Sequence, residues 1–308
     1  MPDDIRDRLV GPAADEALAW LGLTDDAAAE VRAVARRIAD DPALIAEQEK
    51  VHAVLKEAMG IPRPWEVVHL PRRYNPDDGD APALDRWWYL VAAMAFVPDT
   101  LAFHRDHGIP EDVSRRTLAD AGLHVRLHRR MYGRSGFGQE GWISIHLRGL
   151  LYDLGRLQFN LTTLRLPTEQ IRAAGLPLDS GTVVLDTHIP ESGPLRPDDV
   201  AASLARARAF FTEHFPQYAP YDYAICNSWL LDPQLQQLVP GTNIDAFCRV
   251  WTPLDPGVEA DISALNFIFR RPGTPLADLP RDSTLHRAVI DHMSAGGHLI
   301  QAMGYVAL

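Results

Sequence analysis

The chain has 308 residues, of which 46% are hydrophobic, and its formal net charge is -11 at pH 7. A chain of this length can bury a core without disulfides, and its two cysteines, Cys226 and Cys248, both lie in apolar runs. The acidic balance argues against a nonspecific nucleic-acid or anionic-membrane surface. The sequence shows no charged-then-apolar leader and no apolar run of membrane length. We therefore expect a cytoplasmic protein that binds neither nucleic acid nor membrane.

The first half of the chain has the periodicity of helices. Apolar residues recur at helical spacing from Arg6 to Met59, and Leu84 to Phe103 is typical of a buried aromatic helix. A further helix is predicted from Ser114 to Tyr132. The glycine-rich break from Gly133 to Gly138 lacks the Gly-Lys-Ser/Thr string of a phosphate-binding loop and does not follow a clear strand, so we interpret it as a hinge or turn. These patterns predict an all-helical N-terminal domain over residues 1–150.

After Arg156 the pattern changes to that of strands. A strand from Leu157 to Leu164 and a second from Thr182 to Leu185 are predicted to pair like a hairpin. The remaining predicted elements are a helix from Pro197 to Phe215, strands over Tyr223–Trp229, Ile244–Thr252 and Ala264–Arg270, and a helix from Thr284 to Ala295. The predicted fold class is α+β, with residues 151–308 forming a mixed β-sheet flanked by helices.

A turn from His188 to Leu195 joins the second strand to the long helix. Glycine and proline in this turn, the N-terminus of the helix and polar residues at the ends of both neighbouring strands are suited to hold an anionic ligand beside reactive groups. We therefore place the functional site here.

Several strings make the chain resemble a known family. They are His188-Ile189-Pro190 with Gly193-Pro194-Leu195, Phe210-Phe211, Ser228 to Pro233, Asn243-Ile244, and Leu265 to Arg270. In these residues the chain resembles bacterial GNAT-like acyltransferases, which join an N-terminal helical acyltransferase domain to a GNAT-like C-terminal domain. Two departures stand out: Asn227 occupies a position where the related string usually carries histidine, and the usual GNAT phosphate loop is missing.

The resemblance implies acyl-CoA as the donor substrate. The strands that end at His188 and Trp229 are expected to splay, so that the pantetheine arm can bind to their backbone N–H and C=O groups. The donor's phosphates are expected at the start of the following helix. The expected donor-binding residues are Ile189, Gly193, Leu195 and Arg196.

Acyl transfer to an amine requires removal of a proton, polarisation of the thioester carbonyl and protonation of the thiolate. His188 is the predicted base because its reference pKa is about 6.5, although it could instead only bond the turn. Glu191 could act as the base through water or orient His188. Cys226 is the candidate nucleophile of an acyl-enzyme route, with His188 on a neighbouring strand as its activator; inert packing is the alternative. Ser228 could protonate the thiolate or bind the acceptor.

No metal is expected. His124 and His128 stand four residues apart, as metal-binding pairs do, but neighbouring arginines such as Arg126 and Arg129 disfavour a cation there.

The predicted function is transfer of an acyl group from acyl-CoA to a small amine or peptide acceptor, directly in a ternary complex. One alternative is a catalytically inactive GNAT-like module that binds a protein or a carrier-linked acyl group. Another is an acyltransferase that takes its donor from an acyl carrier protein, which needs no pocket for the adenosine phosphates.

Overall fold

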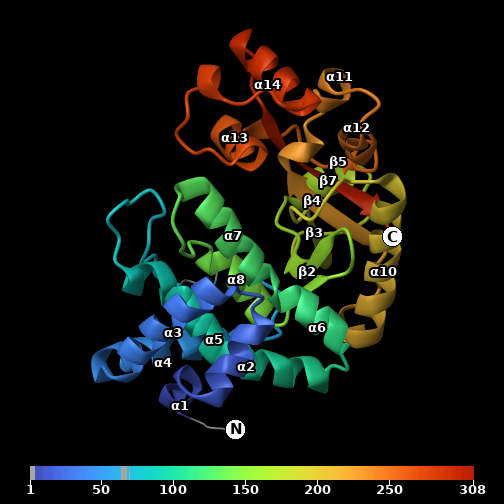
Figure 1. The fold of residues 1–308 in the computed structure, drawn as a ribbon. Coiled ribbons are helices and arrows are strands. Elements are labelled where there is room, and N and C mark those ends of the chain that lie inside the picture. Colours follow the sequence, from blue (N-terminus) through green and yellow to red (C-terminus); the bar gives the residue numbers. More distant parts are fainter. Residues whose placement is uncertain (1–3, 64–67, 69) are drawn as a thin grey trace. The chain divides into compact units, whose positions relative to one another are not determined.

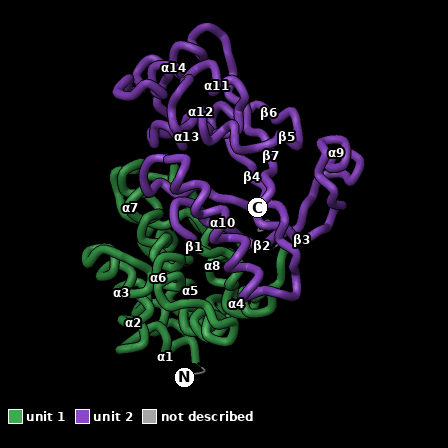
Figure 2. Tube along the Cα trace, turned by 90° about the vertical axis from the view of Figure 1, so that its right-hand side faces the viewer, with its two compact units in different colours: residues 1–153 green, residues 154–308 purple. Residues whose placement is uncertain are grey.

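The computed structural model describes residues 4–63, 68 and 70–308. It divides into two compact units, residues 1–153 and 154–308, which Figure 2 shows in different colours. We describe each unit by itself. Among the described residues, no helix has the length and apolar run needed to cross a membrane.

Unit 1 (residues 1–153) is helical, as predicted, and is built around one long buried helix. Its elements are α1 (Ile5–Leu9), α2 (Pro12–Trp20), α3 (Asp25–Ala39), α4 (Pro42–Glu57), α5 (Ala83–Asp106), α6 (Glu111–Leu118), α7 (Asp120–Tyr132), α8 (Glu140–Leu147) and the short strand β1 (Leu151–Asp153). Helix α5 contacts α1, α2, α3, α4 and α8 (Figure 1). Its apolar residues face all directions, which explains why Trp87 and Phe96 are both fully buried.

The predicted helix from Ser114 to Tyr132 is two helices, so this prediction was wrong. Ser114 lies inside α6, where its hydroxyl bonds the carbonyl of Pro110, and the chain bends at Ala119 before α7. The bend brings Gly122 against the preceding loop, where an added Cβ would lie 1.9 Å from the carbonyl oxygen of Gly22. Only glycine allows this approach. The predicted break at Gly133 is present, with a left-handed φ of 67° that ends α7.

A buried carboxylate joins α7 to α8. Oδ2 of Asp120 accepts a hydrogen bond from Nε1 of Trp142 at 2.7 Å, and lies 3.2 Å from Nε2 of His146 and 3.3 Å from Nε2 of His124. Burial opposes ionisation of Asp120, but these partners outweigh it and hold the carboxyl pKa well below its usual range. His128 bonds the hydroxyl of Tyr74 instead, so the two histidines spaced four apart have different partners.

We expect Asp120→Asn to lower the free energy of unfolding by about 3 to 5 kcal/mol, because it removes the buried negative charge beside Trp142, His146 and His124. The depressed pKa means that the carboxylate stabilises the fold above its ordinary pKa and that this contribution is lost as the pH falls below it. Denaturant unfolding should therefore show that the variant's free energy of unfolding is lower than that of wild type, and that this difference becomes smaller at acidic pH. Asp112→Asn, which removes an exposed pair with Arg116, is the control and should change little. Equal effects of the two substitutions would contradict the assignment.

Unit 2 (residues 154–308) is a mixed sheet with helices. Its elements are β2 (Gln158–Thr163), α9 (Thr168–Ala173), β3 (Val183–His188), α10 (Pro197–His214), η2 (Pro216–Tyr218), β4 (Tyr223–Ser228), η3 (Trp229–Leu231), α11 (Leu235–Leu238), α12 (Asn243–Cys248), β5 (Thr252–Pro253), β6 (Val258–Glu259), α13 (Asp261–Phe269), η4 (Leu276–Asp278), α14 (Thr284–Ser294) and β7 (Ile300–Ala307). The strand order within the unit is β2-β3-β4-β7-β5, and β6 also pairs with β7. Pairing is parallel between β3 and β4 and antiparallel elsewhere in the unit.

The predicted pairing of the first two strands is confirmed, from Gln158 opposite His188 to Thr163 opposite Val183. The two strands predicted over residues 244–252 and 264–270 were wrong, because most of the first segment is α12 and nearly all of the second is α13. Thr242 caps α12 by accepting a bond from the backbone N–H of Asp245. In α13, the short apolar runs Ala264-Leu265 and Phe267 to Phe269 are interrupted only by Asn266, so periodicity alone did not separate helix from strand.

Sequence reasoning missed β7, which lies between β4 and β5 in the sheet. Glycine, glutamine and alanine interrupt its apolar pattern. Gly304 is required by packing, because an added Cβ would lie 2.9 Å from side-chain atoms of Leu231 and Trp251.

Candidate active site

The parallel strands β3 and β4 pair over a short stretch only. Their register comprises Leu185 opposite Ala224 and Asp186 opposite Ile225, and stops there. Beyond this point β3 continues to pair with β2 on its outer side, and β4 continues to pair with β7. The two strands thus diverge at their carboxyl ends while each is held from outside. We call this region the strand opening.

The register also determines which side chains share a face of the sheet. Paired residues point to one face, and the side alternates along each strand. His188, Asp186 and Asn160 therefore share one face, whereas Cys226 and Ser228 lie on the other. His188 is thus not placed to activate Cys226, contrary to the arrangement considered from sequence.

His188 is held by a side chain of the neighbouring strand. Its Nε2 bonds Oδ1 of Asn160, while Nδ2 of Asn160 donates to the carbonyl of Leu161 at 3.1 Å. Because the amide oxygen accepts, Nε2 of His188 carries the proton and Nδ1 is the basic nitrogen. Oδ2 of Asp186 lies 3.8 Å from Nε2, where its charge would stabilise an imidazolium. The imidazole is 23% exposed.

Asn160 and Asp186 were not predicted as site residues. Asn160 lies 28 positions before His188 in the chain, so no local pattern links them. The one available signal was a buried strand that carries Gln158, Asn160 and Thr162 on one face.

The far side of the strand opening is polar too. Asn227 follows Ile225 by two residues on β4, so it lies on the same face as His188. Nε2 of Gln301, on β7, donates to Oδ1 of Asn227 at 3.1 Å. An imidazole and a carboxylate on β3 thus share a face of the sheet with carboxamides on β4 and β7.

Arg156 supports the loop that follows β3. Its guanidinium donates to the carbonyls of Pro194 at 3.0 Å, Pro190 at 3.1 Å and Gly193 at 2.8 Å. Burial lowers the pKa of Arg156 from its usual value. These three bonds fix the loop just before the N-terminus of α10. Sequence reasoning missed Arg156, because its partners lie 34 to 38 residues away.

The predicted donor-binding residues occupy this loop. Leu195 is buried and Ile189 is half-buried. Gly193 has a left-handed φ of 129°, which favours glycine. Arg196 is exposed and occupies the N-cap position of α10 without a side-chain cap bond.

The other predicted catalytic residues have structural partners. Oε2 of Glu191 forms an ion pair with Nε of Arg270 at 2.9 Å, which ties the turn to the end of α13. Oγ of Ser228 accepts from the backbone N–H of Leu230 at 3.1 Å and caps η3. Cys226 is fully buried, and burial together with the charge of Asp186 raises the pKa of its thiol. This environment disfavours the thiolate that an acyl-enzyme would require.

A mixed sheet whose central parallel pair opens toward a supported loop and a helix N-terminus defines the GNAT-like class of acyltransferase fold. The model of the GNAT-like C-terminal domain matches residues 151–306, and that of the N-acyltransferase N-terminal domain matches residues 12–149. The chain therefore belongs to the family of acyltransferases that carry these two domains.

Solved structures agree with this assignment. An acyltransferase in complex with decanoyl-CoA and teicoplanin is 37% identical, with a TM-score of 0.81, and the match covers 97% of this chain and 88% of that one. A mutant acyltransferase in complex with octanoyl-CoA is 36% identical, also with a TM-score of 0.81, and the match covers 98% of this chain and 93% of that one. No curated protein matches the chain significantly. The protein is an acyltransferase of GNAT-like fold.

We expect Arg156→Lys to weaken acyl-CoA binding, because an ammonium group cannot replace three bonds from one guanidinium. A loss of about 1 to 3 kcal/mol of loop stabilisation should raise the Kd for acyl-CoA roughly 5- to 150-fold. Calorimetric titration with acyl-CoA measures this. Arg206→Lys is the matched control, since Arg206 makes a single bond to the carbonyl of Leu154 in the same unit. If Arg156→Lys and Arg206→Lys bound acyl-CoA with equal affinity, the loop would not be part of the donor site.

Proposed function

We propose that the protein transfers an acyl group from acyl-CoA directly to an amine of a glycopeptide-type acceptor. The observation that carries this proposal is the 37% identity, over 97% of this chain, to an acyltransferase in complex with decanoyl-CoA and teicoplanin. The presence of a basic imidazole nitrogen beside the strand opening supports an amine as the nucleophile.

The donor binds along the strand opening. There the diverging strands β3 and β4 offer backbone groups to the amides of the pantetheine arm. The phosphates bind at the N-terminus of α10, where backbone N–H groups and the helix dipole favour negative charge. Arg196 is the cation at this position. Asp198 and Asp199 also lie in the first turn and are exposed, so we expect their carboxylates to point away from the phosphates.

The reaction needs one base and one proton donor. Nδ1 of His188 removes a proton from the amine, and Asp186 stabilises the resulting imidazolium. The amine nitrogen bonds to the thioester carbon, and the C–S bond then breaks to release CoA thiolate. The imidazolium of His188 holds the proton taken from the amine and is the group that protonates the thiolate, because Ser228 lies on the other face of the sheet and caps η3.

The transfer is direct, without an acyl-enzyme. Cys226 would be the nucleophile of the covalent route, but its burial and raised pKa work against it. Burial of this thiol is the physical reason to prefer a ternary complex.

Incubation with decanoyl-CoA and a glycopeptide that bears an amine should yield acylated glycopeptide, measured by mass spectrometry. An acceptor with its amine blocked beforehand is the control and should remain unchanged. Without acceptor, the intact protein should gain no acyl mass, and Cys226→Ala should retain most activity. An adduct that disappears in Cys226→Ala would contradict direct transfer. Activity only with acyl carrier protein as donor would contradict the role of CoA, and no transfer with either donor would favour a binding module.

We expect His188→Gln to lower kcat/KM by about 10²- to 10⁴-fold at neutral pH, because glutamine keeps a hydrogen-bonding side chain but takes no proton. The deficit should shrink at high pH, where the acceptor amine is already deprotonated. Donor affinity and Tm should stay close to wild type. The comparison variant is Glu191→Gln, which we expect to retain activity. A His188→Gln protein that loses stability in proportion to activity would instead assign His188 to holding the turn.

A further inference from the structure

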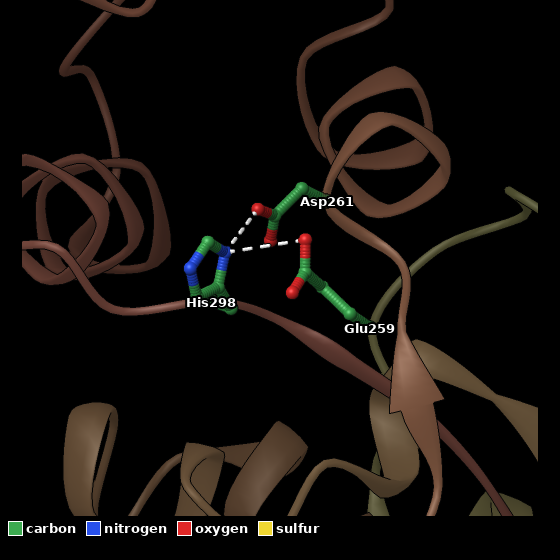
Figure 3. Close-up of side chains that lie close together, drawn as sticks. All are labelled: Glu259, Asp261 and His298. Carbon is green, nitrogen blue, oxygen red and sulfur yellow. Dashed lines mark hydrogen bonds and ion pairs between the residues drawn. The ribbon is translucent and has the colours of Figure 1, made fainter.

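Three side chains with metal-ligating atoms converge at one edge of unit 2. Glu259 ends β6, Asp261 begins α13 and His298 lies just before β7 (Figure 3). Nδ1 of His298 lies 2.7 Å from Oδ2 of Asp261 and 3.4 Å from Oε1 of Glu259. All three ligating atoms lie within 4.8 Å of one another. Within the described part of the chain, no other group of three such residues meets this geometry.

The spacing fits the coordination shell of a small divalent ion. Ligands about 2.0 to 2.1 Å from a tetrahedral Zn²⁺ are separated from one another by roughly 3.3 Å. The distances from Nδ1 of His298 to the carboxylate oxygens, 2.7 Å and 3.4 Å, lie on either side of this value. Small side-chain movements would therefore let all three groups coordinate one ion. One imidazole and two carboxylates are also a ligand set that suits Zn²⁺ better than Mg²⁺.

Surrounding hydrogen bonds hold two of the three ligand residues, through the side chain of Asp261 and the backbone of His298. Oδ1 of Asp261 accepts from the backbone N–H of Leu299 at 2.7 Å, which turns Oδ2 toward the imidazole. The carbonyl of His298 accepts from Nε2 of Gln234 at 3.0 Å. Such partners beyond the ligands restrict their rotation and strengthen metal binding.

We propose that Glu259, Asp261 and His298 form a binding site for a divalent transition-metal ion of the Zn²⁺ type. The side chains of His298 and Glu259 are 58% and 63% exposed, which leaves room for water as a further ligand. A proton on the imidazole competes with the metal ion for Nδ1 of His298, because the hydrogen bond to Asp261 raises the pKa of His298. The bound ion would join β6, the start of α13 and the segment before β7. This site is independent of the proposed acceptor.

Calorimetric titration of metal-free protein with Zn²⁺ tests the proposal. Wild type should bind one equivalent, and His298→Ala, which leaves every other histidine in place, should weaken this binding more than about tenfold. Glu259→Gln should also weaken it, and this variant keeps the backbone bond of Asp261. Asp282→Asn, which removes an exposed carboxylate elsewhere in the unit, is the charge control and should bind like wild type.

Co²⁺ provides a second measurement, because its visible absorption reports direct coordination. The Co²⁺ spectrum of wild type should differ from that of the aqueous ion, and His298→Ala should abolish the difference. Unchanged Zn²⁺ affinity in both His298→Ala and Glu259→Gln would overturn the proposal. So would equal affinity for Mg²⁺ and Zn²⁺, which would indicate diffuse attraction to an acidic surface.

Discussion

The short pairing between β3 and β4 is the constraint on which the candidate site depends. Two parallel strands that stop pairing leave backbone donors and acceptors to be satisfied by something else. Here the divergence does not loosen the strands, since antiparallel pairing with β2 and β7 continues on their outer sides. In the proposed complex, an amide-bearing donor arm supplies the missing partners. The sheet can therefore present an open edge without becoming flexible.

Two polar networks keep the surroundings of this opening in place. Arg156 donates to three carbonyls of the loop after β3. Asn160 accepts a hydrogen bond from Nε2 of His188 and so determines which imidazole nitrogen carries the proton. Both supporting residues lie on or immediately before β2, which has no place in the reaction itself. Strand β2 thus positions the loop through one residue and the imidazole through the other. Rigid support from a neighbouring strand is more precise than support from within the loop.

The sequence predicted the helical unit, strands β2 to β4 and the loop that carries the candidate donor-binding residues, because each has a strong local signal. It failed where the signal was not local. The end of α13 consists of short apolar runs that fit a helix or a strand, and β7 contains Gly304 because of packing against Leu231 and Trp251. The partners Asn160 and Arg156 are defined by strand register and by a long-range contact. Only folding brings them to the residues that were predicted.

The strand register also bears on the substitution at Asn227. In related chains the string around this position usually carries histidine, and its loss could suggest an inactive protein. Asn227 and His188 each lie two residues beyond the last paired residues, on the same face of the sheet. A group at either position therefore reaches the strand opening from the same side. His188 has Asp186 and Asn160 beside it, so in the proposed mechanism the base comes from position 188 and does not depend on a histidine at position 227.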